Sequence, residues 1–159
     1  KIQTFDLEKI YPDGERVALD ISQWLYKGFV VKEKEFRESL KNHNWEQYQD
    51  QFIALYCSND AIVPEWAYML ITTYLKNYAQ KIIYGSLHEL EIQIFNDMIR
   101  QIDPEKYRDK PVIIKGCSEK TIPQNAYIQL VQKLQPIVKS MMFGEACSSV
   151  PLYKKPRKR

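Results

Sequence analysis

The apolar residues of the chain follow two different periods, and their order predicts helices and strands in turn. Within 34–42, apolar residues recur four positions apart, which is the spacing of an amphipathic helix. The range 86–101 keeps helical spacing over a longer stretch, so we expect a second helix there. The continuous apolar runs 52–56 and 112–115 are short, as is typical of buried parallel strands.

Two prolines mark where further helices begin. Pro64 and Pro123 each follow a polar loop after an apolar run, and a proline costs little at a helix start, where its missing N–H has no partner. The runs 81–84 and 140–143 come next, and each is followed by a glycine. We expect these runs to be strands, which makes each half a β-α-β unit. The alternative is that each run ends a helix and the glycine caps it.

The sequence also repeats itself at a constant offset, at which Phe36 falls on Phe95. At this offset segment 34–85 matches 93–144, and Cys57 meets Cys117 with a slip of one residue. Self-similarity at a fixed period indicates repeated supersecondary units. We therefore expect one pseudo-twofold α/β domain over 1–153, built from two duplicated α-β-α-β units around a mostly parallel sheet.

The two ends of the chain lie outside this repeat. Near the start, Asp20 is placed to cap a short helix over 21–25, and 28–31 is a candidate extra strand. The last six residues hold five of the 23 basic residues, so the rest of the chain has 18 basic against 20 acidic groups. We expect 154–159 to form a disordered basic tail, and we expect no nucleic-acid partner, because the basic groups are not spread over a folded face.

Composition places the chain in a reducing compartment. No apolar run approaches the length of a membrane span, and no secretory signal is visible, so we expect no membrane partner. Three cysteines without a signal argue against a disulfide framework. We therefore expect a cytoplasmic protein.

The repeat register also brings together a set of groups that could hold a metal. The same offset that relates the two halves carries His88 onto Cys147, so the third cysteine has a histidine as its counterpart. Parallel strands of one sheet end at the same edge, where Cys57 and His88, and likewise Cys117 and Cys147, should emerge. Three cysteines and one histidine suit zinc or an iron–sulfur cluster. We therefore predict a metal site made of these four residues.

A simpler interpretation of the cysteines stays open. The chain has no CxxC motif, and the wide, nearly even gaps between the four ligands match no standard metal-binding spacing. A free cysteine often packs as a small hydrophobic residue, so all three thiols can equally be structural.

Three stretches resemble a bacterial family filed as domain of unknown function 2480. They are NDAIVPEWAYMLI at 59–71, IIKGCS at 113–118 and MFGEACSSVPLY at 142–153, and the likeness extends from about Val17 to Lys155. The resemblance implies no assigned activity. It implies a genomic association with the sulfur-mobilisation machinery of iron–sulfur cluster assembly, which fits a thiol or metal role.

These observations favour a non-enzymatic accessory protein with a thiol-rich site, linked to metal or to iron–sulfur and sulfur handling. The alternative is a metal-free module with structural cysteines that binds a protein partner or itself. An enzyme with a single activated cysteine is the third hypothesis.

Overall fold

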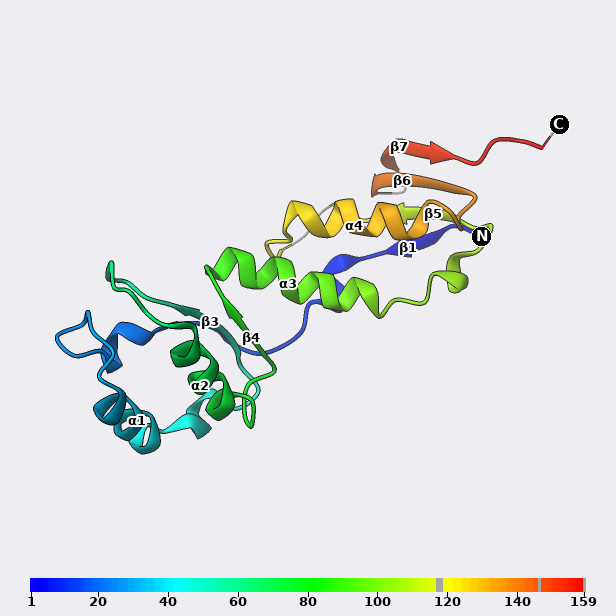
Figure 1. The fold of residues 1–159 in the computed structure, drawn as a ribbon. Coiled ribbons are helices and arrows are strands. Elements are labelled where there is room, and N and C mark those ends of the chain that lie inside the picture. The colour runs from blue at the N-terminus through cyan, green and yellow to red at the C-terminus, as the bar shows by residue number, and fades with distance from the viewer. Residues whose placement is uncertain (117–118, 146, 159) are drawn as a thin grey trace. The chain divides into compact units, whose positions relative to one another are not determined.

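The chain is organised as two compact α/β units. A computed structural model describes residues 1–116, 119–145 and 147–158. Unit 1 comprises residues 1–12 and 92–159, and unit 2 comprises residues 13–91 (Figure 1). Unit 2 is therefore inserted, in sequence, between the first strand of unit 1 and the rest of it.

Unit 2 is a three-stranded parallel sheet with two connecting helices. Its elements are β2 (Arg16–Asp20), the 3-10 helix η2 (Ile21–Trp24), α1 (Glu33–Asn42), η3 (Trp45–Tyr48), β3 (Phe52–Tyr56), α2 (Glu65–Leu75) and β4 (Lys81–Tyr84). The strand order is β2-β3-β4, and both pairings are parallel. α1 and α2 pack on the same face of the sheet, because buried residues of both helices share one cluster with β3.

The core of unit 2 explains why these segments fold as they do. Phe36 and Leu40, the apolar pair that predicts the first helix, are fully buried on α1. Ile53 and Leu55 alternate along β3 and belong to the same cluster, as does Ile71 of α2. Apolar residues four positions apart on α1 and two positions apart on β3 therefore face the same hydrophobic core.

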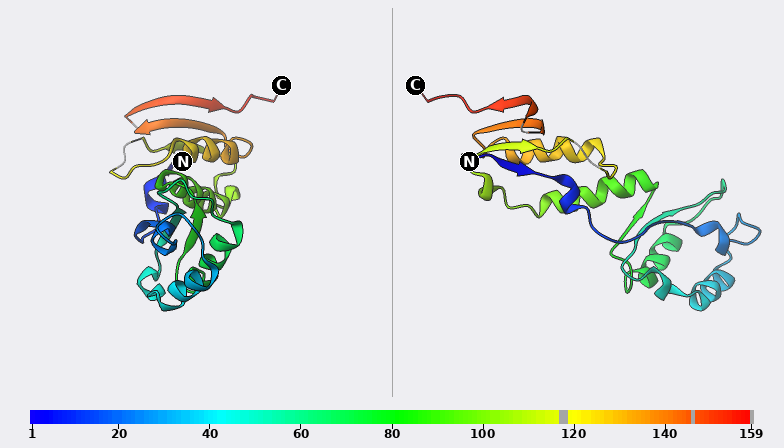
Figure 2. Two further views of the ribbon diagram at one scale, coloured as in Figure 1. Left: turned by 60° about the vertical axis from the view of Figure 1, so that its left-hand side comes forward. Right: turned by 180° about the vertical axis from the view of Figure 1, so that it is seen from behind.

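Unit 1 has a four-stranded sheet of order β1-β5-β6-β7. Its elements are β1 (Gln3–Phe5), η1 (Leu7–Ile10), η4 (Pro104–Tyr107), β5 (Pro111–Ile114), α4 (Gln124–Leu134), β6 (Ser140–Glu145) and β7 (Ser148–Lys154). Helix α3 (Leu87–Arg100) begins among the residues of unit 2 and belongs to unit 1 from Ile92 onwards. The first three strands are parallel, while β7 runs antiparallel to β6 at the end of the sheet (Figure 2).

The core of unit 1 lies between the sheet and its two helices. Phe95 of α3 and Leu130 of α4 are fully buried, and Val112 of β5 belongs to the same cluster. Phe5 of β1 belongs to this cluster too, so the first strand is part of the core despite its three-residue length.

The α/β class and the mostly parallel strands are confirmed, but the expectation of one sheet is wrong. The central strands β3 and β5 belong to different sheets, because each is already paired on both sides within its own unit. One edge of β5 is occupied by β1, a strand that the apolar pattern does not indicate. With both edges hydrogen-bonded, β5 has no free side for a strand of unit 2.

The two units share their strand register. In unit 2, Phe52 of β3 pairs with Lys81 of β4; in unit 1, Pro111 of β5 pairs with Ser140 of β6. Each residue of the second pair follows its counterpart in the first at the offset of the sequence repeat. The offset found in the sequence therefore reappears as the alignment of the strands.

The turns that lead into β3 and β5 match as well. Asp50 and Asp109 both have positive φ, 59° and 56°, a conformation that few residues other than glycine adopt. The backbone N–H of Asp50 donates to the carbonyl of Tyr78, and that of Asp109 donates to the carbonyl of Ile137, at 3.0 and 2.9 Å. Donor and acceptor of the second bond again follow those of the first at the repeat offset.

The N-terminal segments also match, at a different offset. β1 leads through Asp6 into η1, and β2 leads through Asp20 into η2. Each aspartate caps its 3-10 helix by accepting an N–H two residues on, from Glu8 and Ser22 at 3.0 Å. The sequence interpretation left these segments outside the repeat.

At the other end, the basic tail is partly engaged. Lys154 is the last residue of β7, and the backbone N–H of Lys155 donates to the carbonyl of Lys139 at 2.9 Å. The side chain of Lys155 also pairs with Asp109 at 2.9 Å. The disordered tail stays a prediction for the residues after Lys155.

Candidate functional site

The carboxyl edge of the unit 2 sheet collects polar groups from all three strands. Asp20 is the last residue of β2, Cys57 directly follows β3, and Tyr84 is the last residue of β4. Because these strands are parallel, their ends share one edge, the edge at which open parallel sheets bind ligands. We call this set, together with Ser22, Ser58 and Tyr68, the unit 2 edge cluster.

Asp20 ties two segments of this edge together. Its carboxylate accepts the N–H of Ser22 at 3.0 Å and the N–H of Ser58 at 3.1 Å. The hydroxyl oxygens of Ser22 and Ser58 are 3.2 Å apart. Burial alone would raise the pKa of Asp20, but the hydrogen bonds from Ser58 and Ser22 outweigh it and lower the pKa below its usual value. The residue is therefore a fixed carboxylate that holds the loop after β3.

Tyr68 supplies a hydroxyl from α2 to the same edge. Its ring meets that of Tyr84 edge to face, with centroids 5.1 Å apart. Burial raises the pKa of Tyr68 to about 12, and Tyr84, Cys57 and Asp20 add to the rise. The phenol therefore stays protonated at physiological pH. Cys57 is half-buried beside this group and packs against the core.

Unit 1 carries a related but more charged edge. Asp6 pairs with the ammonium of Lys115 at 3.5 Å, and this pairing raises the pKa of Lys115. The carboxylate of Glu8 accepts the N–H of Glu119 at 3.3 Å. An acidic side chain from the N-terminal segment thus contacts the loop after the central strand, as Asp20 does in unit 2.

The aromatic pair at this edge differs between the units. In unit 1 the edge-to-face pair is Tyr127 with Phe143, with centroids 5.8 Å apart. Phe143 stands at the position that Tyr84 holds in unit 2. The aromatic pair therefore has two hydroxyl groups in unit 2 and only one in unit 1.

A glycine allows the loop after β5 to approach the end of β6. A Cβ at Gly116 would lie 3.3 Å from the Cα of Gly144 and 2.9 Å from the ring of Phe143, so any side chain there would clash. Cys147 is exposed in the turn between β6 and β7, three residues after Gly144. Cys117 follows Gly116 and lies outside the described residues.

The four predicted ligands are divided between the units. Cys57 and His88 belong to unit 2, where His88 is an exposed residue of the first turn of α3, and Cys147 belongs to unit 1. Over the described ranges, no three histidine, cysteine, aspartate or glutamate side chains gather closely enough to hold a metal. Because the predicted set includes Cys117, the four-residue metal site stays a prediction.

The edge cluster contains residues that the sequence interpretation missed. The sequence pattern predicts Asp20 only as a helix cap and assigns Tyr68 no role at a site. One signal is present in the chain: Asp6-Leu7 and Asp20-Ile21 both place an aliphatic residue directly after an aspartate. That match places an acidic residue at both sheet edges.

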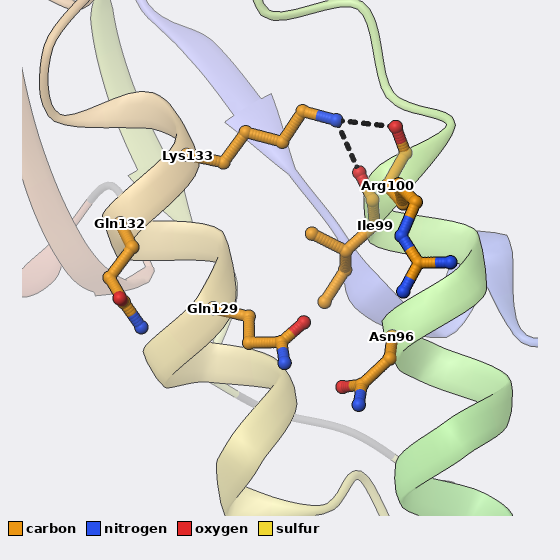
Figure 3. A pocket seen from close by; sticks show the side chains of 6 residues that line it. All are labelled: Asn96, Ile99, Arg100, Gln129, Gln132 and Lys133. Carbon is orange, nitrogen blue, oxygen red and sulfur yellow. Dashed lines mark hydrogen bonds between the residues drawn. The ribbon is translucent and has the colours of Figure 1, made fainter.

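A polar cleft of about 400 Å³ lies between α3 and α4 in unit 1 (Figure 3). The ammonium of Lys133 donates to the backbone carbonyls of Ile99 and Arg100 at 2.7 Å each, which satisfies the last turn of α3. The side-chain oxygen of Asn96 is buried there without a hydrogen-bond partner. The described residues that line the cleft include no nucleophile, and its lysine is already bonded, so we interpret it as a helix-packing site.

Comparison with known proteins finds a family and no characterised relative. The family described as "Protein of unknown function (DUF2480)" matches residues 1–155. No curated protein and no solved structure matches the chain. Among the described residues, no helix has the length and apolar character needed to cross a bilayer.

Proposed function

Because the chain belongs to this family of proteins of unknown function, matched over residues 1–155, we propose a function from its own residues. In this proposal the chain is a cytoplasmic accessory protein with a thiol-rich site. Cys57, Cys117 and Cys147 act as metal ligands or sulfur acceptors, and His88 is the fourth group. This donor set suits zinc or an iron–sulfur cluster.

The observation that carries the proposal is the position of these groups after matched strands. Cys57 follows β3 and Cys117 follows β5, and each of these strands is paired on both sides in its sheet. The second group of each unit comes after the next strand: His88 after β4 and Cys147 after β6. The shared register of these strand pairs supports the inference that the units arose by duplication around a pseudo-twofold relation, and that the four groups are related by it.

The accessibility of the thiols supports a role in sulfur chemistry. Cys147 is exposed and Cys57 is half-buried, and both are free thiols. As an acceptor, a thiolate of this chain attacks the outer sulfur of a donor persulfide. A new S–S bond forms on this chain, the donor S–S bond breaks and the donor thiolate leaves, so no external oxidant is needed.

Metal analysis of the protein purified without oxygen tests the proposal. The wild-type chain should carry close to one zinc ion or one cluster, and each of Cys57→Ser, Cys117→Ser, Cys147→Ser and His88→Asn should lose it. Ser58→Ala and Ser148→Ala, next to two of the cysteines, should keep it. Full reactivity of all three thiols together with absence of metal would contradict the ligand role, and failure to accept sulfur from a persulfide donor would contradict the acceptor role.

The second candidate function is a metal-free interaction module. It is favoured by apolar side chains that are exposed on α4 and β7 of unit 1, namely Ile128, Val150 and Leu152. In that case, the three Cys→Ser substitutions change packing only.

A further inference from the structure

Unit 1 contains an apolar groove between α4 and the end of its sheet. Its volume is about 740 Å³. The helix side is formed by Tyr127, Ile128 and Val131, and the sheet side by Phe143, Val150 and Leu152. We call it the β7 groove.

The groove follows from the number of strands. α3 and α4 pack on β1, β5 and β6 through one core, but β7 is added beyond β6 with no helix of its own among the described residues. Val150 and Leu152 of β7 are consequently 60% and 49% exposed, and Ile128 on the facing side of α4 is 56% exposed. A sheet face of this kind needs a covering layer to bury its apolar residues.

The lining of the groove is uncharged. Of the described residues that form it, none is Asp, Glu, Lys or Arg; its polar members are glutamines, including Gln124 and Gln132. The chain as a whole is 27% charged, so this patch differs from the rest of the surface. It also lacks the lysines and arginines with which a peripheral helix holds a lipid surface.

We propose that the occupant of the β7 groove is the same groove of a second copy of this chain. In a twofold contact a surface meets itself, so a charge near the axis would face an identical charge, and an uncharged lining avoids this repulsion. The groove also offers an apolar side chain for such a contact, because Ile128 lines it and is 56% exposed. This inference rests on the second candidate function, and its test substitutes Ile128 and Val150, neither of which is a proposed thiol-site ligand.

The contact uses side chains rather than strand addition. β7 is the last strand of the sheet and contains Pro151, which has no N–H to donate to a further strand. Proline in an edge strand is a recognised barrier to edge-to-edge pairing. The copies therefore meet through α4 and the exposed face of β7.

Light scattering coupled to size exclusion tests the proposal on the full chain, from about 1 to about 100 μM. The wild-type protein should dimerise with rising concentration. Ile128→Glu should raise the dissociation constant at least about tenfold, because it places two like charges in the contact. Met69→Glu is the matched control: Met69 is 67% exposed at the equivalent position of α2, and unit 2 has no β7 counterpart.

Charge pairing separates a second copy from any other occupant. Ile128→Glu and Ile128→Lys should each be monomeric alone and should form a heterodimer when mixed. Val150→Thr, which keeps a strand-forming residue, should weaken the dimer if Ile128→Glu fails to fold. A monomer at every concentration, including one whose groove binds an apolar dye, overturns the proposal. So does a wild-type dimer that Ile128→Glu and Val150→Thr leave intact. The metal content of the protein, which tests the thiol site, is measured separately from its oligomeric state.

Discussion

Unit 2 and unit 1 follow the same order of strands and helices until their last parallel strand, and there they part. After β4 the chain enters α3, whereas after β6 it turns back as β7. The two helices of unit 2 cover its three-stranded sheet. The two helices of unit 1 leave the fourth strand of its sheet, β7, uncovered. The comparison shows that a strand added without a helix leaves an apolar sheet face exposed and available for contact.

The same point of divergence changes the chemistry of the two edges. The segment after Gly85 presents His88 in the first turn of a helix, while the segment after Gly144 presents Cys147 in a tight turn. His88 and Cys147, which match in the sequence, therefore lie in segments of different secondary structure. A histidine and a cysteine at matched positions differ in reach as well as in chemical character.

The largest expected effect tests whether the two cores are independent. Ile71→Ala on α2 and Leu130→Ala on α4 remove fully buried side chains at matched positions. Each should lower the free energy of unfolding by about 2–5 kcal/mol. Because the two core clusters share no residue, amide exchange should speed up mainly in the unit that carries the substitution.

Ile62→Ala serves as the control, because Ile62 is 95% exposed and its truncation should cost less than about 0.5 kcal/mol. Equal loss of amide protection in both units from either core substitution would show that they unfold as one.

A smaller effect distinguishes the two capping aspartates. Asp20→Ala leaves two backbone N–H groups without their acceptor and should cost up to about 2 kcal/mol, against about 1 kcal/mol for Asp6→Ala. Urea unfolding measures both, with the exposed Asp60→Ala as control. Because the pKa of Asp20 is lowered, its contribution is present above about pH 4 and is lost as the pH falls through the folded-state pKa. A cost for Asp20→Ala that does not shrink in acid would contradict this role.

The next effect is a pH dependence of the free energy of unfolding, which we expect to arise from His43 in unit 2. His43 accepts or donates a 2.7 Å hydrogen bond with Tyr48 and lies edge-on to Trp24 and Trp45, and burial lowers its pKa. Unfolded histidine binds a proton near pH 6.5, so the free energy of unfolding should fall as the pH drops below that value. The change should stay below about 1 kcal/mol, because solvent screens a partly exposed ring.

His88, the other histidine, is exposed and provides the comparison. His43→Gln should remove the pH dependence between about pH 5 and 7, and His88→Gln should keep it. The reverse result would assign the titration to His88 and would contradict the role of His43.

The smallest effect concerns the tail of unit 1. The pair between Lys155 and Asp109 is exposed and screened by solvent, so Lys155→Ala should leave the urea midpoint of unfolding nearly unchanged. Deletion of 156–159 should leave the melting temperature unchanged. A loss of several degrees from that deletion would mean that the tail packs on the unit.

The sequence predicts those elements whose signals are local. The runs 52–56 and 81–84 coincide with β3 and β4, because a continuous apolar stretch between polar loops is a sufficient signal for a buried strand. β1 is missed because two of its three residues, Gln3 and Thr4, are polar, and its pairing with β5 joins distant parts of the chain. β7 is missed because its serines and Pro151 are typical of a loop.

The candidate strand at 28–31 illustrates the opposite error. Gly28 has φ +78°, and the segment forms a turn closed by a single bridge between Tyr26 and Val30. Apolar residues there are not enough to make a strand, because no neighbouring strand among the described residues pairs with them.

The edge cluster shows the limit of local reasoning about a site. That Asp20 caps η2 is evident from its place before an apolar residue, and the bond to Ser22 confirms it. Its second bond, to Ser58, joins residues 38 positions apart and depends on the pairing of β2 with β3. Tyr68 is missed for a related reason, because helical spacing alone does not show which aromatic ring of a helix lies at a sheet edge.

The order of the strands along the chain has a consequence during synthesis. β1 is translated before unit 2, but its partner β5 begins only at Pro111, after all of unit 2. At about 5–20 residues per second, β1 waits roughly 5–20 seconds for its partner, while every strand of unit 2 has already emerged. The ribosome therefore releases a chain whose inserted unit can fold while the first strand is still unpaired, and the completion of unit 1 is the step that ends this exposure.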